Sequence, residues 1–185
     1  MPDTFSYISP FALSDGSDGP PFSNHGKTAN IQELALPTIV CLSGKPDDKD
    51  LPATNGIIQL SDSRSIFALA PDQWLICDTA MTAEEVMAET RERYSTKTIV
   101  CADHSQAWSA LRLSGTDATK VLSRLCPADL HPEAFAGNTL IQTNMASMYI
   151  LCRHTPDEAN SFDLYMSHSY SRAFYEALRD AVEIG

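Results

Sequence analysis

Glycine is scarce in this chain, and the motifs that depend on it are missing. The 185 residues include eight glycines, and these are not clustered. Neither GxGxxG nor GxxxxGKS/T occurs, so the loops in which glycine lets the backbone approach a phosphate are absent. The GxSxG turn that presents a serine nucleophile is also absent. We therefore expect a chain that does not bind a dinucleotide by itself.

Basic residues and long apolar runs are also few. Thirteen Lys and Arg face 24 Asp and Glu, for a net charge of −11. Nucleic acids and anionic lipids bind clustered Lys and Arg, so we expect neither a nucleic acid nor a membrane as partner. No apolar run approaches the ~20 residues of a membrane-spanning helix. The start of the chain does not resemble a secretory signal, which predicts a cytoplasmic protein.

Five cysteines occur, and no two of them form a CxxC pair. Most stand inside apolar runs such as "TIVCL", "WLICD" and "TIVCA". This placement is typical of small core residues in a reducing compartment, and it argues against a disulfide framework.

The chain divides into an arm and two α+β subdomains. Residues 1–30 are rich in Pro, Gly, Ser and Asp, without a period of 2 or 3.6, and carry scattered aromatic residues. They predict an extended N-terminal arm pinned against this chain or another subunit. Residues 31–103 and 104–185 form the first and second subdomains. Each has only about 75 residues, so we expect the two to share an interface.

The first subdomain begins with a strand in "ALPTIVCLSG" and continues with a hairpin around "APDQ". Pro71 and Asp72 there are typical of a type I turn. Thr82 and Glu85 form the capping-box pattern, which predicts a helix that starts at this point. A further strand is expected in "TKTIVCADHS".

The second subdomain repeats this order. A strand in "SQAWSALRLSG" precedes a helix capped by Thr116 or Ser114 and ended by Pro127. Two strands in "LIQTNMASMYILCR", one in "FDLYMS" and a final helix follow. The two halves predict an α+β fold of two pseudo-repeated split-βαβ (ferredoxin-like) units, with mostly antiparallel sheet.

The stretch "RLCPADLHPEAF" is the strongest candidate for a metal or thiol site. It brings together Cys126, Asp129, His131 and Glu133. A zinc site needs paired Cys or His ligands and a second locus, which the sequence lacks. Cys126 ends a predicted helix, where the helix dipole raises a thiol pKa. We interpret the stretch as structural, with Asp129 capping a one-turn helix, and expect no catalytic, cofactor-binding or metal-binding residue on this chain.

The triplet "DHS" and the tryptophans are the remaining candidates. Neighbours on a strand point to opposite faces, so residues 103–105 cannot form a local triad. Trp74 and Trp108 lie on predicted strands, where they serve either as core residues or as interface anchors. The residues that we expect at an interface are Phe5, Tyr7, Phe11, Trp74 and Trp108.

Five segments occur together in one order: "LAPDQWLI", "ADHSQAWSALRLSG", "VLSRLCPADLHPEAF", Thr143 and "FDLYMSHSYSRAFYEAL". In order and spacing they resemble the gamma subunit of heterotetrameric sarcosine oxidase, over roughly residues 34–183. That family looks like the folate-binding aminomethyltransferase fold of the T-protein of glycine cleavage.

The resemblance implies a non-catalytic subunit that assembles with alpha, beta and delta subunits. That complex oxidises sarcosine to glycine, passes the methyl carbon to tetrahydrofolate or releases it as formaldehyde, and reduces oxygen to hydrogen peroxide. The implied cofactors are FAD, FMN, NAD and tetrahydrofolate in the partner subunits, and zinc in the delta subunit, with none on this chain.

Some positions depart from the family pattern and leave alternatives open. Ala70 replaces a glycine, and His104 stands where the family has valine. An equivalent small subunit of an N-methylglutamate dehydrogenase-type complex is one alternative. A stand-alone folate-binding module for one-carbon transfer is another, with Asp103 or Asp129 holding the pterin. An independent thiol or metal enzyme is the third.

Overall fold

The structure is a computed structural model, and it describes residues 11, 23–25, 28–46, 51–95, 98–130, 135, 139–155 and 160–184. Its strands are β1 (Ser23–His25), β2 (Asn30–Glu33), β3 (Thr38–Gly44), β4 (Ile57–Gln59), β5 (Arg64–Ala70), β6 (Gln73–Asp78), β7 (Ile99–Asp103), β8 (Trp108–Ser114), β9 (Leu140–Met145), β10 (Met148–His154) and β11 (Ser161–Ser167). Its helices are α1 (Ala83–Arg93), α2 (Ala118–Leu125) and α3 (Ser171–Glu183), and a 3₁₀ turn, η1 (His168–Tyr170), precedes α3.

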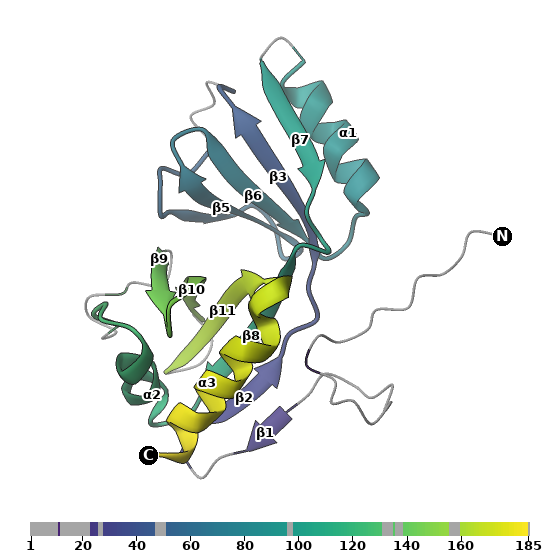
Figure 1. The fold of residues 1–185 in the computed structure, drawn as a ribbon. Helices are drawn as coiled ribbons and strands as arrows, with labels where there is room; N and C mark the ends of the chain where they lie inside the picture. The colour runs from purple at the N-terminus through teal and green to yellow at the C-terminus, as the bar shows by residue number, and fades with distance from the viewer. Residues whose placement is uncertain are drawn as a thin grey trace, which may run out of the picture.

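The strands form two sheets (Figure 1). The six-stranded sheet has the order β1-β2-β8-β11-β10-β9, and the five-stranded sheet has the order β4-β5-β6-β3-β7. Strand pairs within both sheets are antiparallel. The expected α+β class with mostly antiparallel sheet is thereby confirmed.

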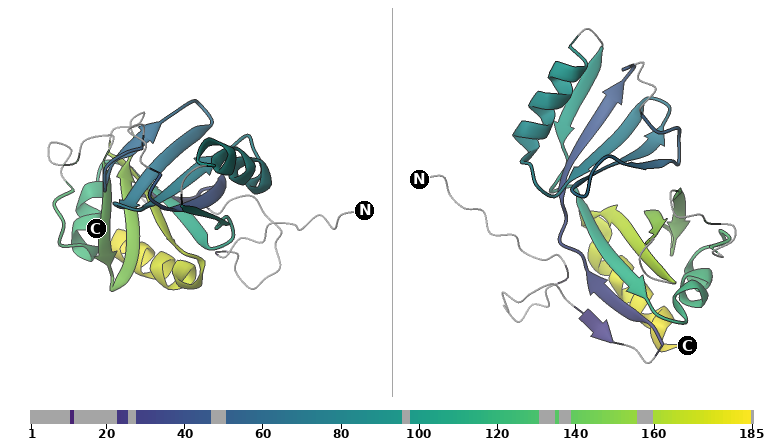
Figure 2. Two further views of the ribbon diagram at one scale, coloured as in Figure 1. Left: turned by 90° about the horizontal axis from the view of Figure 1, so that it is seen from above. Right: turned by 180° about the vertical axis from the view of Figure 1, so that it is seen from behind.

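Three apolar clusters stack the elements in layers (Figure 2). One lies between the six-stranded sheet and helices α2 and α3, and includes Leu122 and Phe174. The second joins the two sheets, and the third lies between the five-stranded sheet and α1. Since both faces of the six-stranded sheet are covered, residues 161–166 of β11 are all buried.

Turn and capping residues in the sequence correctly predicted one hairpin and the start of one helix. The β5–β6 hairpin turns at Pro71 and Asp72, and Thr82 caps α1 with a capping box to Glu85. The expected cap of α2 was wrong: its N-cap is Asp117, without a side-chain hydrogen bond. Thr116 instead donates its hydroxyl to the carbonyl of Thr28, because β2 approaches closely here. A Cβ at Gly115, whose φ is +121°, would lie 2.5 Å from that same carbonyl oxygen.

The arm contacts the body of the chain at Phe11. This side chain is 4% exposed, and its ring meets that of Tyr175 on α3 edge-on at 6.2 Å between centroids. Further along the chain, residues 31–33 of β2 lie in the range expected for the first subdomain, but the strand pairs with β8 of the second. The boundaries after residues 30 and 103 stay a prediction.

Candidate functional site

Three charged side chains form a row across the six-stranded sheet. Asp163 on β11 is paired directly with Arg112 on β8 and with Arg153 on β10. Side chains of directly paired residues lie on the same face of a sheet. The carboxylate accepts from Arg112 Nε at 2.7 Å and Nη2 at 3.1 Å, and from Arg153 Nε at 3.0 Å and Nη2 at 2.9 Å.

This row is mostly removed from solvent. The side chain of Asp163 is 1% exposed, and those of Arg112 and Arg153 are 26% and 22% exposed. Burial by itself would lower the pKa of Arg153, but nearby Tyr165 and Asp163 raise it above the ordinary arginine value. The guanidinium therefore stays charged, and it lies 5.6 Å from the centroid of the Phe67 ring.

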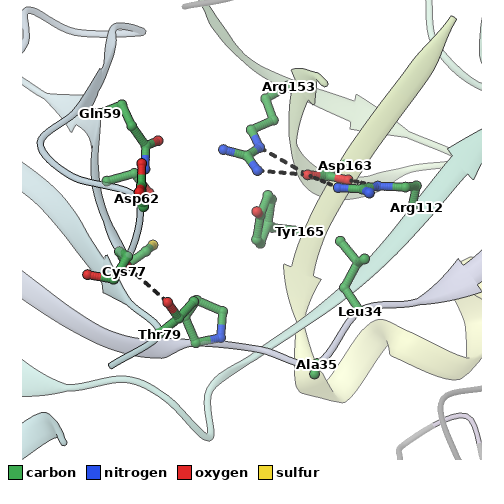
Figure 3. A pocket seen from close by; sticks show the side chains of 13 residues that line it. Leu34, Ala35, Gln59, Asp62, Cys77, Thr79, Arg112, Arg153, Asp163 and Tyr165 are labelled. Carbon is green, nitrogen blue, oxygen red and sulfur yellow. Dashed lines mark hydrogen bonds and ion pairs between the residues drawn. The ribbon is translucent and has the colours of Figure 1, made fainter. Parts of the chain in front are cut away.

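The row forms one wall of a pocket between the two sheets (Figure 3). The cavity has a volume of about 230 Å³. The six-stranded sheet contributes Arg112, Arg153, Asp163 and Tyr165; the five-stranded sheet and its adjoining turns contribute Gln59, Asp62, Ser63, Ser65, Cys77 and Thr79; and the segment between β2 and β3 contributes Leu34, Ala35 and Pro37. The pocket thus combines charged, hydroxyl and apolar surface.

The thiol and the phenol that line the pocket are not ionised near neutral pH. Burial raises the pKa of the Cys77 thiol to about 12, despite the opposing effect of Arg153. Burial also raises the pKa of the Tyr165 hydroxyl well above its ordinary value. Both groups are neutral near pH 7, so they can donate hydrogen bonds but cannot act as anionic nucleophiles.

A second ion-pair cluster holds α1 to the five-stranded sheet. Arg64 on β5 donates Nε to Asp78 on β6 at 2.6 Å and Nη1 to Glu89 on α1 at 3.0 Å. The other carboxylate oxygen of Asp78 accepts from the backbone N–H groups of Ala80 and Met81 at 2.8 and 2.9 Å. This cluster orders the connection between β6 and α1.

The residues of "RLCPADLHPEAF" do not assemble a site in the described chain. Cys126 ends α2 and is 4% exposed, with its sulfur 3.5 Å from the Thr143 hydroxyl. Asp129 is exposed. His131 and Glu133 lie outside the described residues. Within the described residues, His, Cys, Asp and Glu do not form a group of three that could hold a metal ion.

The "DHS" triplet forms a turn between β7 and β8. Asp103 accepts from the backbone N–H of Ser105 at 2.9 Å and from its hydroxyl at 2.6 Å, and that hydroxyl accepts from the N–H of Ile39 at 3.0 Å. Residues 103 and 105 lie near each other because the strand ends between them. His104 takes no part in these bonds. Asp103 and Asp129, the candidate pterin ligands, do not line the pocket.

A serine–histidine contact occurs that the sequence pattern did not suggest. The Ser109 hydroxyl lies 3.1 Å from Nδ1 of His168, two residues 59 positions apart. Within the described residues, no carboxylate bonds to His168, so a catalytic triad is not formed there. Ser109 itself is fully buried.

The expected interface residues occupy different environments. Trp74 is 6% exposed and donates its indole N–H to the carbonyl of Pro52 at 3.1 Å, as a core residue does. Trp108 is half-buried against the cluster between the sheets. Phe11 packs on α3, and Phe5 and Tyr7 lie outside the described residues. Their contact with a partner stays a prediction.

The arginine–aspartate row of Arg112, Asp163 and Arg153 was not predicted from the sequence. A signal was present: Arg112, Arg153 and Asp163 interrupt the apolar runs "SALRLS", "YILCRH" and "FDLYMS". Charged residues are almost never fully buried unless they are paired. Three charges inside buried strands therefore pointed to an internal ion-pair network.

Comparison with solved structures assigns the class of fold. The chain superposes on a heterotetrameric sarcosine oxidase from Corynebacterium sp. U-96 with a TM-score of 0.75 and 24% identity, over 86% of each chain. It also superposes on the glycine cleavage system aminomethyltransferase T from Bartonella henselae with a TM-score of 0.59 and 17% identity. The latter match covers 82% of this chain and 45% of that chain. The fold is thus of the aminomethyltransferase type.

The family follows from the sequence. The model of the "Sarcosine oxidase, gamma subunit family" matches residues 35–183. The sarcosine oxidase subunit gamma of Corynebacterium sp. (strain P-1) is 30% identical over 144 residues, which cover 71% of this chain and 70% of the relative. The chain belongs to the sarcosine oxidase gamma subunit family, as its motifs had indicated.

Among the described helices, none is both long and apolar enough to cross a bilayer.

Proposed function

We propose that this chain is the non-catalytic gamma subunit of a heterotetrameric sarcosine oxidase. It assembles with alpha, beta and delta subunits, and the complex converts sarcosine to glycine, with the methyl carbon leaving to tetrahydrofolate or as formaldehyde and oxygen reduced to hydrogen peroxide. FAD, FMN, NAD and tetrahydrofolate are held by the partner subunits, and zinc by the delta subunit. The assembly is cytoplasmic.

The family match over residues 35–183 carries this proposal. The chemistry of the described residues is consistent with it. The thiols of Cys77 and Cys152 are buried, and burial raises the pKa of both. In the arginine–aspartate row, Arg112 and Arg153 both form ion pairs with Asp163. These side chains are suited to holding a scaffold together.

The docking surface is proposed to include Phe5, Tyr7, Phe11, Trp74 and Trp108. Trp108 is partly exposed and can touch a partner directly. Trp74 and Phe11 are buried in this chain, so they would support the interface from beneath. The net charge of −11 favours a partner with a more basic face, since complementary charge speeds association.

Co-expression with alpha, beta and delta subunits tests the proposal. We expect a yellow complex that contains this chain and forms hydrogen peroxide from sarcosine. The chain purified alone should be colourless and inactive. Turnover of sarcosine by the isolated chain would contradict the non-catalytic role.

The same preparation separates the alternatives. Faster oxidation of N-methylglutamate than of sarcosine, without peroxide, would assign the chain to a dehydrogenase-type complex. Saturable binding of tetrahydrofolate to the isolated chain would instead support a stand-alone folate-binding module. Neither result is expected.

A further inference from the structure

The pocket between the sheets contains hydrogen-bond donors that the protein leaves unused. A guanidinium carries five N–H donors. In Arg153, Nε and Nη2 donate to Asp163, whereas Nη1 has no acceptor among the described residues. Figure 3 shows a terminal nitrogen of Arg153 directed into the cavity, away from Asp163.

Two hydroxyl groups that line the same cavity are also without a hydrogen-bond partner in the described part of the chain. Ser65 is 8% exposed and Tyr165 is 7% exposed. Neither hydroxyl bonds to another group in the described part of the chain. Because the pKa of Tyr165 is raised, its hydroxyl keeps its proton near pH 7 and remains a donor. Donors from β5, β10 and β11 thus line one space between the two sheets.

The charge of Arg153 favours an anion. The Arg153 guanidinium stays charged, and Asp163 engages only its Nε and Nη2, so the remaining N–H groups on Nη1 suit an anionic acceptor. The Cys77 thiol is neutral near pH 7 and does not oppose an anion. Asp62 also lines the pocket, but it is exposed, and water screens its charge.

The remaining wall is apolar and determines the kind of anion. Leu34, Ala35 and Pro37 line the pocket from the segment between β2 and β3. They provide contact for carbon atoms and offer no side-chain donors. Inorganic phosphate and sulfate have no carbon atoms to contact this apolar wall. A short aliphatic carboxylate has oxygen atoms for the donors and carbon atoms for the wall.

We propose that this pocket binds a small aliphatic monocarboxylate. The carboxylate oxygens accept from Arg153 Nη1 and from the hydroxyls of Ser65 and Tyr165. The aliphatic end contacts Leu34, Ala35 and Pro37. This binding site goes beyond the scaffold role, and the bound ligand undergoes no reaction there. Its occupancy links the two sheets through a shared ligand and so stabilises their packing.

Calorimetric titration of sodium propionate into the full-length chain, or into its complex, tests the site. Propionamide keeps the shape without the charge, and sodium sulfate supplies an anion without a carbon end. All titrations are made at equal ionic strength. We expect saturable binding of propionate in the millimolar range, and none of propionamide or sulfate.

Variants locate the binding. Arg153→Met should weaken propionate binding by about tenfold or more, since it removes a charged hydrogen bond. Tyr165→Phe and Ser65→Ala, which preserve shape and volume closely, should each weaken it several-fold, and they carry the test if Arg153→Met fails to fold. Arg172→Met, on the exposed face of α3, is the matched control and should bind as the parent does.

The proposal is overturned by any of three results. The first is that propionate shows no saturable binding. The second is that Tyr165→Phe and Ser65→Ala bind propionate as tightly as the parent chain does. The third is that sulfate or propionamide binds as strongly as propionate.

Discussion

Asp163 and Arg153 are direct cross-strand neighbours on β11 and β10, joined by two hydrogen bonds of 2.9 and 3.0 Å. On its other side, the same carboxylate meets Arg112 in a two-pronged contact. Asp163 therefore holds three strands at one register, and it does so within the face that packs on the second sheet.

Asp163→Asn should destabilise the protein strongly. The substitution removes the negative charge that two guanidiniums, each about three-quarters covered, share. Removing one partner of a buried ion pair costs about 3–5 kcal/mol, and we expect a loss near the lower end of that range in urea unfolding. Asp180→Asn, which breaks an exposed pair with Arg179, should leave the midpoint unchanged. A stable Asp163→Asn protein would show that the row contributes little.

Thr82→Ala should shorten or weaken α1. The Thr82 hydroxyl accepts from the N–H of Glu85, and the Glu85 carboxylate accepts from the N–H of Thr82 at 2.8 Å. Loss of an N-cap side chain costs about 1 kcal/mol of unfolding free energy. Thr54→Ala, at an exposed turn position, is the control. Equal stabilities of the two variants would mean that the cap is not formed.

Protonation of Asp78 should lower the stability of the fold as the pH falls. Burial by itself would raise the pKa of this carboxyl, but backbone donors and Arg64 lower it below the ordinary value. A lowered folded-state pKa contributes stability that is present above the unfolded value, ~3.9, and lost as the pH falls through the folded value. Wild type should therefore exceed Asp78→Asn in stability at pH 7, and the difference should shrink below about pH 4. A difference independent of pH would refute this assignment.

Phe11→Ala should loosen the attachment of the arm. The buried ring packs against Tyr175, and removing a buried phenylalanine typically costs about 3 kcal/mol, including the cavity that it leaves. Chemical unfolding measures the loss. Tyr170→Ala removes an aromatic ring that is 48% exposed and serves as the comparison. If both variants lose equally little, Phe11 does not anchor the arm.

Trp108→Ala should weaken assembly more than it weakens folding. The side chain is half-buried, and tryptophan is frequent at the energetic centres of interfaces. In the co-expressed complex, we expect less of this chain to co-purify with the partners. Tyr149→Ala, an exposed aromatic residue outside the proposed surface, should assemble normally. Normal assembly of the Trp108 variant would remove this residue from the interface.

Local patterns predicted the elements whose formation depends on near neighbours. The β5–β6 hairpin and the capped start of α1 each need only a few adjacent residues. Strand β2 was not predicted. Its four residues carry a weak local signal, and they become a strand because they pair with β8, about 80 residues away. For the same reason, the side-chain cap of α2 was misassigned where β2 approaches.

The sequence by itself determined the α+β class, most of the helices and strands, and the sarcosine oxidase gamma subunit family, because these follow from local periodicity, capping residues and motif order. Only the tertiary structure decided that Arg112, Arg153 and Asp163 meet, and that Ser65 and Tyr165 line the same cavity as Arg153. Such contacts depend on strand register and on the packing of one sheet against the other. These are set by interactions along the whole chain, which no short segment encodes.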